Sequence, residues 1–152
     1  MKRCLLAGLV LSLMVVAGCG DPCASPESEA ILARAAAEEG AIRTESGLVF
    51  RQLQAGYGPL PTLANRVQVH YVGRFADGTE FDNSYKRRGP SSFQLDEVIP
   101  GWTEGLQLLN GGGKAKLTIP AGLAYGKKGK KGSIPPCTTL IFEVELLGIY
   151  DQ

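Results

Sequence analysis

The stretch Val98-Ile99-Pro100-Gly101-Trp102 contains the only tryptophan of this 152-residue chain. Its proline has no N–H for a strand ladder and its glycine can adopt a positive φ, so we expect the chain to turn here. After the turn, Trp102, Leu106 and Leu109 recur at spacings of four and three residues, which is typical of one face of a short helix. We therefore expect a short helix that carries the indole into the middle of the fold.

Around this stretch, three segments alternate apolar and polar residues with the period of two that is typical of half-buried strands. They are residues 67–75, 114–119 and 139–146. Such strands fit an antiparallel sheet with one face in water, and the Trp102 helix is the only internal candidate to cover the other face. We expect an α+β domain in which a curved antiparallel β-sheet wraps around this one short α-helix.

Residues 1–18 predict a signal peptide of the lipoprotein type. Lys2 and Arg3 precede an uncharged run that ends in small residues before Cys19, and the run is too short for a spanning helix of about 20 residues. We expect cleavage before Cys19 and lipidation of this cysteine. The protein would then be lipid-anchored in the bacterial cell envelope, facing the periplasm, on the outer membrane rather than the inner one. A plain secretory peptide is the alternative.

Residues 19–43 form the predicted lipid-anchored tether. Ser25-Pro26-Glu27 offers an N-cap, a proline at the first helical position and an acidic first turn, and Gly40 could end a helix of about 14 residues. Ile31 and Leu32 are the only large apolar residues of this helix, so the sequence favours a solvated spacer over a packed helix.

The composition agrees with one exported domain. Without the signal peptide about 134 of the 152 residues remain, enough for one core, and the formal charge changes from +1 to −1 with the loss of two positive residues. Nothing in this balance suggests a nucleic-acid partner. Cys4 leaves with the signal and Cys19 is the lipidation candidate, so only Cys23 and Cys137 could pair. The sequence leaves this disulfide open and favours free thiols, because Cys23 lies in the tether and its position relative to Cys137 cannot be read.

Several motifs in a fixed order resemble the FKBP-type peptidyl-prolyl cis-trans isomerases. They are Tyr71, Gly78-Thr79-Glu80-Phe81-Asp82, Val98-Ile99-Pro100-Gly101-Trp102, Ala124-Tyr125-Gly126, and Ile134-Pro135-Pro136 followed by the strand 140–146. Residues 46–50 and 99–106 are most similar to the bacterial, macrophage-infectivity-potentiator-like branch. The resemblance implies an FKBP-like isomerase domain at 44–152 that accelerates rotation of Xaa-Pro bonds in exported proteins.

The implied reaction needs no nucleophile, cofactor or metal. Rotation about the bond before proline is slow because amide resonance must be broken, and a dry pocket can favour the twisted amide over both planar forms. The single histidine, His70, falls on the wet face of its strand and reads as an exposed or edge residue. A hypothesis from another class is an envelope chaperone or client-binding module that holds clients with little turnover.

The resemblance implies a pocket with Trp102 as its floor. The residues expected to have catalytic roles are Tyr71, Phe81, Asp82, Ile99, Trp102, Tyr125 and Phe142. The residues expected to bind substrate are Phe93, Val98, Ile134 and Arg87. Ile99 would offer its backbone N–H and Tyr125 its hydroxyl to peptide carbonyls, and Asp82 would lie at the rim, held by Tyr71 or Arg87. The alternatives are that Phe93 and Phe142 serve only the core and that Asp82 is a turn residue.

The chain departs from the family pattern in three places. Ser91 stands where many members have a second aromatic residue, and the segment from Leu95 to Val98 is shorter than theirs. The loop 126–133 contains four lysines, Lys127, Lys128, Lys130 and Lys131. Such a charge run is usually solvated, although it could steer acidic clients. The expected partners are proline-containing unfolded or exported polypeptides, macrolide inhibitors, and the membrane through lipid on Cys19. A monomer is favoured because the tether is shorter than the dimerising segment of the branch.

Overall fold

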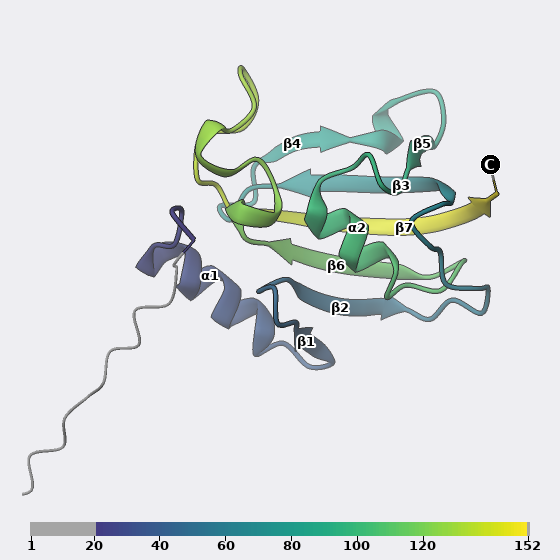
Figure 1. The fold of residues 1–152 in the computed structure, drawn as a ribbon, viewed down its shortest axis with the longest axis horizontal. Helices are drawn as coiled ribbons and strands as arrows, with labels where there is room; N and C mark the ends of the chain where they lie inside the picture. The colour runs from purple at the N-terminus through teal and green to yellow at the C-terminus, as the bar shows by residue number, and fades with distance from the viewer. Residues whose placement is uncertain (1–20, 152) are drawn as a thin grey trace, which may run out of the picture.

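The computed structural model describes residues 21–151 and forms one sheet with two α-helices (Figure 1). The strands are β1 (Ala41–Arg43), β2 (Val49–Gln54), β3 (Arg66–Arg74), β4 (Glu80–Asn83), β5 (Ser91–Gln94), β6 (Lys114–Ile119) and β7 (Leu140–Tyr150). The α-helices are α1 (Pro26–Ala36) and α2 (Pro100–Leu106), and the 3-10 helices are η1 (Ser84–Lys86), η2 (Ala121–Leu123) and η3 (Gly126–Lys128). The predicted signal peptide and Cys19 lie outside the described residues. Among the helices of residues 21–151, none has the length and apolar character needed to cross a membrane.

All strand pairs are antiparallel, as the alternating pattern predicts, and the order across the sheet is β1-β2-β6-β7-β3-β4. β3 organises the site, because β5 pairs with its first half and β4 with its last residues on one edge, while β7 pairs along the other edge. Figure 1 shows α2 in front of the central strands. The predicted α+β architecture, a curved antiparallel sheet around one short helix, is confirmed, with α1 as an addition.

The core lies between the sheet and α2. Trp102 and Leu106 of α2 and Leu109 just after it are each at most 4% exposed, as their spacing predicts. The sheet contributes the inward-facing residues Val67, Val69 and Tyr71 of β3, Ala115, Leu117 and Ile119 of β6, and Leu140, Phe142, Val144 and Leu146 of β7. These strands place their apolar residues on one face because successive side chains alternate.

The start of α2 differs from the expected turn. Pro100 is the first residue of the helix and Gly101 follows it inside the helix. A Cβ on Gly101 would lie 2.4 Å from Cγ2 of Ile119, so the glycine is needed for close packing of α2 against β6. The expected short helix is present, and it begins at the Pro-Gly pair itself. Proline tolerates the first helical position, because the N–H that it lacks would have no partner within the helix there.

α1 begins where the sequence offers a helix start. Ser25 is the N-cap, its Oγ accepts a hydrogen bond from the N–H of Ser28 at 3.1 Å, and Pro26 is the first helical residue. The helix ends at Ala36, well before Gly40, which adopts a φ of 74° in the turn before β1. The favoured prediction of a solvated spacer is wrong, and the helix that the sequence offered as the alternative is present, in a shorter form.

α1 packs on the face of the sheet that α2 leaves open. Leu32 and Ala35 form a small apolar cluster with Val49 of β2, whereas the next residue, Phe50, belongs to the main core. Because neighbouring strand residues point to opposite faces, α1 and α2 lie on opposite faces of the sheet. The prediction that this face is only solvated is wrong near β2. The strand that follows α1, β1, pairs with β2 and lies before residue 44, the expected start of the domain.

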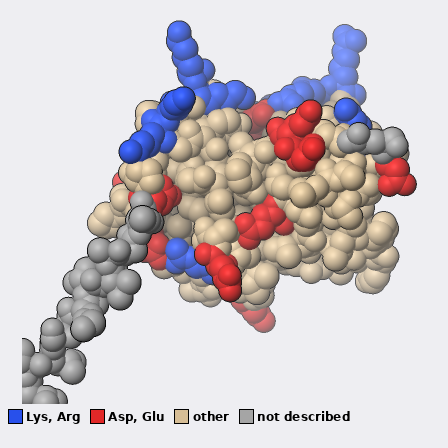
Figure 2. All heavy atoms as spheres, in the orientation of Figure 1, with Lys and Arg blue, Asp and Glu red and all other residues tan. Residues whose placement is uncertain are grey.

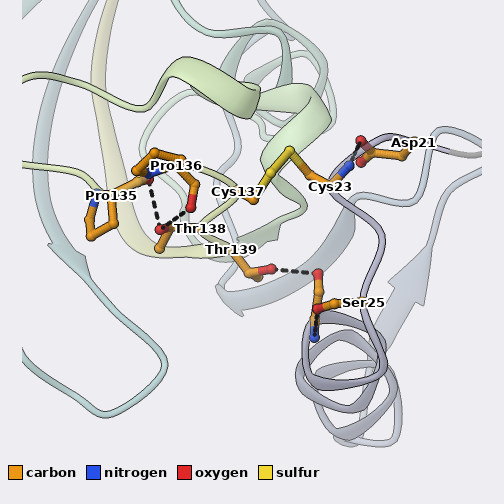
Figure 3. Close-up of a disulfide and its surroundings, with 9 residues drawn as sticks. Asp21, Cys23, Ser25, Pro135, Pro136, Cys137, Thr138 and Thr139 are labelled. Atoms are coloured by element: carbon orange, nitrogen blue, oxygen red, sulfur yellow. Dashed lines mark hydrogen bonds between the residues drawn. A yellow bond between two sulfur atoms is a disulfide. The ribbon is translucent and has the colours of Figure 1, made fainter.

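A disulfide between Cys23 and Cys137 joins the segment before α1 to the loop before β7 (Figure 3). The two Cα atoms are 4.9 Å apart, within the range that a disulfide can bridge. Two residues beyond Cys137, the hydroxyl of Thr139 forms a buried 2.8 Å hydrogen bond with that of Ser28. The preference for free thiols is wrong, because α1 is packed against the sheet and holds Cys23 beside the loop.

Candidate functional site

A cavity of about 450 Å³ opens between the start of α2, the strands β3, β4, β5 and β7, and the segment that joins β6 to β7. Its apolar and aromatic lining residues are Tyr71, Phe81, Phe93, Val98, Ile99, Trp102, Tyr125, Ile134 and Phe142, and its polar lining residues are Asp82, Glu97, Lys130 and Ser133. The structure therefore brings together every predicted pocket residue except Arg87. The family resemblance implied each of these residues, and the fold brings them together here.

Trp102 forms an aromatic cluster with three neighbours from different strands. Its ring meets those of Tyr71, Phe93 and Phe142 edge to face, with centroids 5.0, 5.6 and 5.3 Å apart. Edge-to-face pairs of this kind contribute about 0.5–1.5 kcal/mol each beyond the burial of their area. The indole Nε1 is buried and donates to no group of residues 21–151. The indole is thus fixed by packing from three sides.

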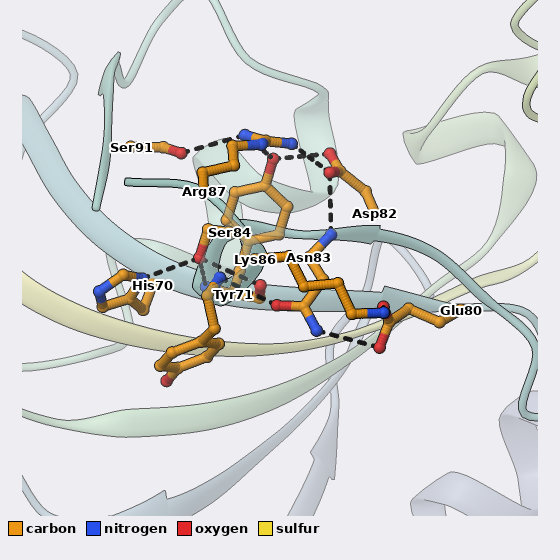
Figure 4. Close-up of polar contacts among 10 residues, drawn as sticks. His70, Tyr71, Glu80, Asp82, Asn83, Ser84, Lys86, Arg87 and Ser91 are labelled. Atoms are coloured by element: carbon orange, nitrogen blue, oxygen red, sulfur yellow. Dashed lines mark hydrogen bonds and ion pairs between the residues drawn. The ribbon is translucent and has the colours of Figure 1, made fainter. Parts of the chain in front are cut away.

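The rim beside β4 carries a hydrogen-bonded network of Tyr71, Asp82 and Arg87 (Figure 4). The Tyr71 hydroxyl donates to Oδ2 of Asp82 at 2.7 Å and accepts from Nη1 of Arg87 at 3.2 Å. Nη2 of Arg87 donates to Oδ1 of Asp82, which also accepts from the N–H of Asn83 at 2.9 Å. Arg87 also donates to Oγ of Ser91 at 3.2 Å, the residue that departs from the family pattern. Both expected partners of Asp82 are therefore present.

The pKa values of Asp82 and Tyr71 in this network are displaced in opposite directions. Burial would raise the pKa of Asp82, but hydrogen bonds from Tyr71 and Arg87, the charge of Arg87 and the Asn83 N–H together hold it below its ordinary value. Burial, and then the hydrogen bond to Asp82, raise the pKa of Tyr71 to about 12. At neutral pH the carboxylate is ionised and the phenol is protonated, so the direction of the bond between them is fixed.

Arg87 does not line the cavity, although the sequence counts it with the substrate-binding residues. Its guanidinium lies 5.7 Å from the centroid of the Tyr71 ring and is engaged by the network on the outer side of the rim. The contacts of Arg87 are to Tyr71 and Asp82, and the substrate-binding prediction for it stays a prediction.

Behind the rim, the buried hydroxyl of Ser84 ties β3 to the residues after β4 (Figure 4). Its Oγ accepts from the N–H of Tyr71 at 2.7 Å and donates to the Tyr71 carbonyl at 3.2 Å. The same oxygen lies 2.9 Å from Nδ1 of His70, whose ring stacks on Tyr85 at 4.3 Å. The expectation of an exposed or edge histidine is wrong, because β3 has partners on both sides and Tyr85 covers the ring.

Among the hydrogen-bond donors at the cavity that have no acceptor in residues 21–151, two belong to residues expected to bind peptide carbonyls. The Ile99 N–H is one, since the carbonyl of this residue accepts from Trp102 and Thr103 at the start of α2 while its N–H donates to nothing. The Tyr125 hydroxyl on the opposite wall is the other. A cavity with an apolar floor and two available donors can hold an apolar ring and bind the carbonyls next to it.

Sequence reasoning missed three polar lining residues, Glu97, Lys130 and Ser133. Glu97 could have been found from its position, because it directly precedes Val98 and the central stretch. Lys130 and Ser133 belong to the lysine-rich loop, whose sequence indicated charge but gave no indication of which lysine faces the cavity.

Comparisons with known proteins agree with this geometry. A family model described as FKBP-type peptidyl-prolyl cis-trans isomerase matches residues 58–147. The FKBP-type 22 kDa peptidyl-prolyl cis-trans isomerase of Escherichia coli is 53% identical over 114 residues, which cover 75% of this chain and 55% of that protein. The macrophage infectivity potentiator of Trypanosoma cruzi is 47% identical over 117 residues, with coverages of 76% and 60%.

A solved structure shows the same fold. The crystal structure of FkpA from Escherichia coli superposes with a TM-score of 0.80 and 49% identity, over 82% of this chain and 58% of that one. The chain spans about half of the length of these relatives. The predicted family and fold are confirmed: this chain belongs to the FKBP-type peptidyl-prolyl cis-trans isomerases.

Proposed function

We propose that this protein is a peptidyl-prolyl cis-trans isomerase that accelerates rotation of Xaa-Pro bonds in exported proteins. The observation that carries the proposal is the cavity, whose buried Trp102 floor and aromatic walls leave two free donors at its lip. The family membership of the chain supports the same activity.

The proposed mechanism is non-covalent. The proline ring would lie on Trp102 between the aromatic walls, which removes water from the amide and weakens the resonance that water stabilises in the planar forms. The Ile99 N–H and the Tyr125 hydroxyl would bind carbonyls of the peptide in the conformation that brings the amide toward its twisted form. Lowering the barrier of about 18–20 kcal/mol by about 8 kcal/mol corresponds to a factor near 10⁶.

Asp82 would act through Tyr71 in this mechanism. Three donors already occupy its carboxylate, so its charge is directed at the Tyr71 hydroxyl, Arg87 and Asn83. The same network fixes Tyr71, which packs against Trp102. We therefore assign Asp82 and Arg87 positioning roles, and the contact roles to the apolar and aromatic lining residues.

The activity is tested with a short Xaa-Pro peptide in a protease-coupled or NMR-exchange assay. Wild-type protein should accelerate isomerisation, and Trp102→Leu should reduce kcat/KM by at least about tenfold, which is about 1.4 kcal/mol in the barrier. Family macrolides should inhibit the wild type. A folded wild type with no turnover that still binds unfolded protein would refute the enzyme proposal and favour the client-holding hypothesis.

We also propose that the protein is anchored in the cell envelope by lipid on Cys19. It would face the periplasm from the outer membrane and act as a monomer. The support is the sequence of the export signal before Cys19. Fatty-acid labelling should mark the wild type, and Cys19→Ala should abolish both the label and the membrane fractionation. Labelling that persists in the alanine variant would refute the anchor without affecting the isomerase proposal.

A further inference from the structure

The loop between η3 and β7 borders a second hollow next to the cavity. This hollow of about 420 Å³ is lined by Lys128, Lys130, Lys131, Gly132, Ser133, Ile134, Pro135 and Pro136. Lys130, Ser133 and Ile134 line both spaces, so the two hollows adjoin along these residues. Three of the residues around the second hollow are lysines, whereas the cavity itself is mainly aromatic.

The lysines project from a loop of defined shape. The N–H of Lys130 donates to the carbonyl of Ile134 at 2.8 Å, and the carbonyl of Lys130 accepts from the N–H groups of Ser133 and Ile134. Ile134 is only 6% exposed, which fixes the loop to the core. A Cβ on Gly129 would lie 2.3 Å from the Ile134 carbonyl oxygen, so the loop closes tightly there. The backbone that carries the lysines therefore has a fixed shape.

These positive charges are not neutralised by the rest of the described chain. Lys127, Lys128, Lys130 and Lys131 are exposed, and none of them takes part in the seven ion pairs within residues 21–151. Figure 2 shows Lys and Arg side chains projecting in two groups along one edge of the molecule, and Figure 1 places the loop after η3 at that edge. Lys86 and Arg87, by contrast, are paired with Glu80 and Asp82.

We infer that the second hollow is a subsite for an acidic side chain close to the proline of the substrate. This inference rests on the proposed isomerase function and adds a substrate preference to it. A carboxylate in the hollow would lie among the ammonium groups of Lys128, Lys130 and Lys131 while the proline occupies the Trp102 cavity. The shared lip favours a peptide over an anionic membrane surface, because it connects the charged hollow with the apolar one. Lys130 is the specificity-determining residue, since it lines both.

The test compares three matched peptides whose residue near the proline is Glu, Gln or Lys, placed in one series before and in another series after the proline. For the wild type, in one of the two series, we expect kcat/KM to be about three- to tenfold higher for the Glu peptide than for the Gln peptide, which is the effect of one or two exposed ion pairs. In the same series kcat/KM should be lower for the Lys peptide than for the Gln peptide. The preference should shrink as the Debye length falls from about 10 Å at 0.1 M salt to about 3 Å at 1 M.

Charge reversal identifies the residue responsible. Lys130→Glu should invert the order, so that the Lys peptide becomes the best substrate, and Lys131→Glu should weaken the preference for Glu. Lys127→Glu is the matched control, because it makes the same charge change in the same loop but lines neither space. In this control the order should be kept. Only ratios within each variant are compared, so a general loss of activity does not affect the result.

The remaining outcomes separate this inference from the proposed function. Equal turnover of the three peptides by an active wild type would refute the subsite and leave the isomerase intact. An equal response of Lys127→Glu and Lys130→Glu would show a general field of the loop and would also refute it. Loss of binding to anionic vesicles in Lys130→Glu with unchanged peptide ratios would assign the lysines to a membrane surface instead. No turnover of any peptide by the wild type would contradict the proposed function itself.

Discussion

The cavity has two walls that are held in different ways. On one side, Tyr71 and Phe81 belong to the paired strands β3 and β4, and Trp102 to α2, so backbone ladders and core packing fix them. On the other side, Tyr125, Lys130 and Ile134 belong to the segment between β6 and β7, which has 3-10 turns and the isolated bridge between Lys130 and Ile134. A disulfide at its end replaces the missing ladder. The two walls should therefore respond to different perturbations.

The largest effect is expected at Trp102, in the packed wall. Trp102→Ala should lower the free energy of unfolding by about 3–5 kcal/mol, because it removes a buried aromatic ring and leaves a cavity. Chemical denaturation of the wild type and the variant measures this loss. Trp102→Leu should retain more stability while still losing turnover. Full stability of Trp102→Ala would contradict the packing of the indole between three rings.

Removing the disulfide is the most direct test of the difference between the two walls. Replacing both Cys23 and Cys137 by serine should lower the free energy of unfolding by about 2–4 kcal/mol, because the bond closes a long loop of the unfolded chain. Hydrogen exchange should accelerate in the segment between β6 and β7 and remain slow in β3 and β7. Reduction of the wild type should reproduce this pattern, and the double variant should not respond to the reductant. Uniform acceleration in both walls would mean that the disulfide stabilises the domain as a whole.

The network at Asp82 is expected to show a smaller, pH-dependent effect. Since the pKa of Asp82 is lowered in the folded protein, its ionised form stabilises the fold above the ordinary carboxyl pKa, and this contribution is lost as the pH falls below about 4. Between pH 5 and pH 2, stability should therefore fall more steeply for the wild type than for Asp82→Asn. Other carboxylates with lowered pKa values, such as Glu80, are common to both proteins. Parallel pH curves would contradict the assignment.

Asp82→Val should reduce stability and turnover together. Valine leaves the Tyr71 hydroxyl, the Asn83 N–H and the Arg87 guanidinium without their acceptor, which costs about 1–3 kcal/mol for a buried group and less where water reaches it. Turnover should fall by about tenfold, because Tyr71 loses its fixed position. Unchanged turnover would show that the orientation of Tyr71 does not matter for the reaction.

The smallest effect is expected behind the loop wall. Ser28→Ala removes the buried hydrogen bond to Thr139 that links α1 to the start of β7, and it should lower the free energy of unfolding by about 1 kcal/mol. Thr139→Val removes the other partner and is the matched variant. In the double variant the loss should be smaller than the sum of the two single losses, since both remove the same bond. Strict additivity would show that the two hydroxyls do not interact.

The sequence predicted the packed wall better than the loop wall. Tyr71 and Phe142 lie on strands with a clear alternating pattern, and Trp102 begins a short helical period, so local patterns were enough to place them. The disulfide and the packing of α1 depend on a long-range contact between two regions. α1 covers only a small apolar surface around Val49, so its composition resembled that of a solvated segment. Arg87 was expected among the substrate-binding residues, and the structure shows it bonded to Asp82, five residues earlier, which was the other contact expected of it.

The disulfide also decides where a tethering force would act on the protein. Cys19 and Cys23 are four residues apart in sequence, and four extended residues reach about 14 Å at most. With the proposed lipid on Cys19, tension from the bilayer would pass through Cys23 into Cys137 and the base of the lysine-rich loop as well as into α1. The mouth of the cavity would then stay within a short distance of the membrane surface, and the search for clients would be confined to that layer.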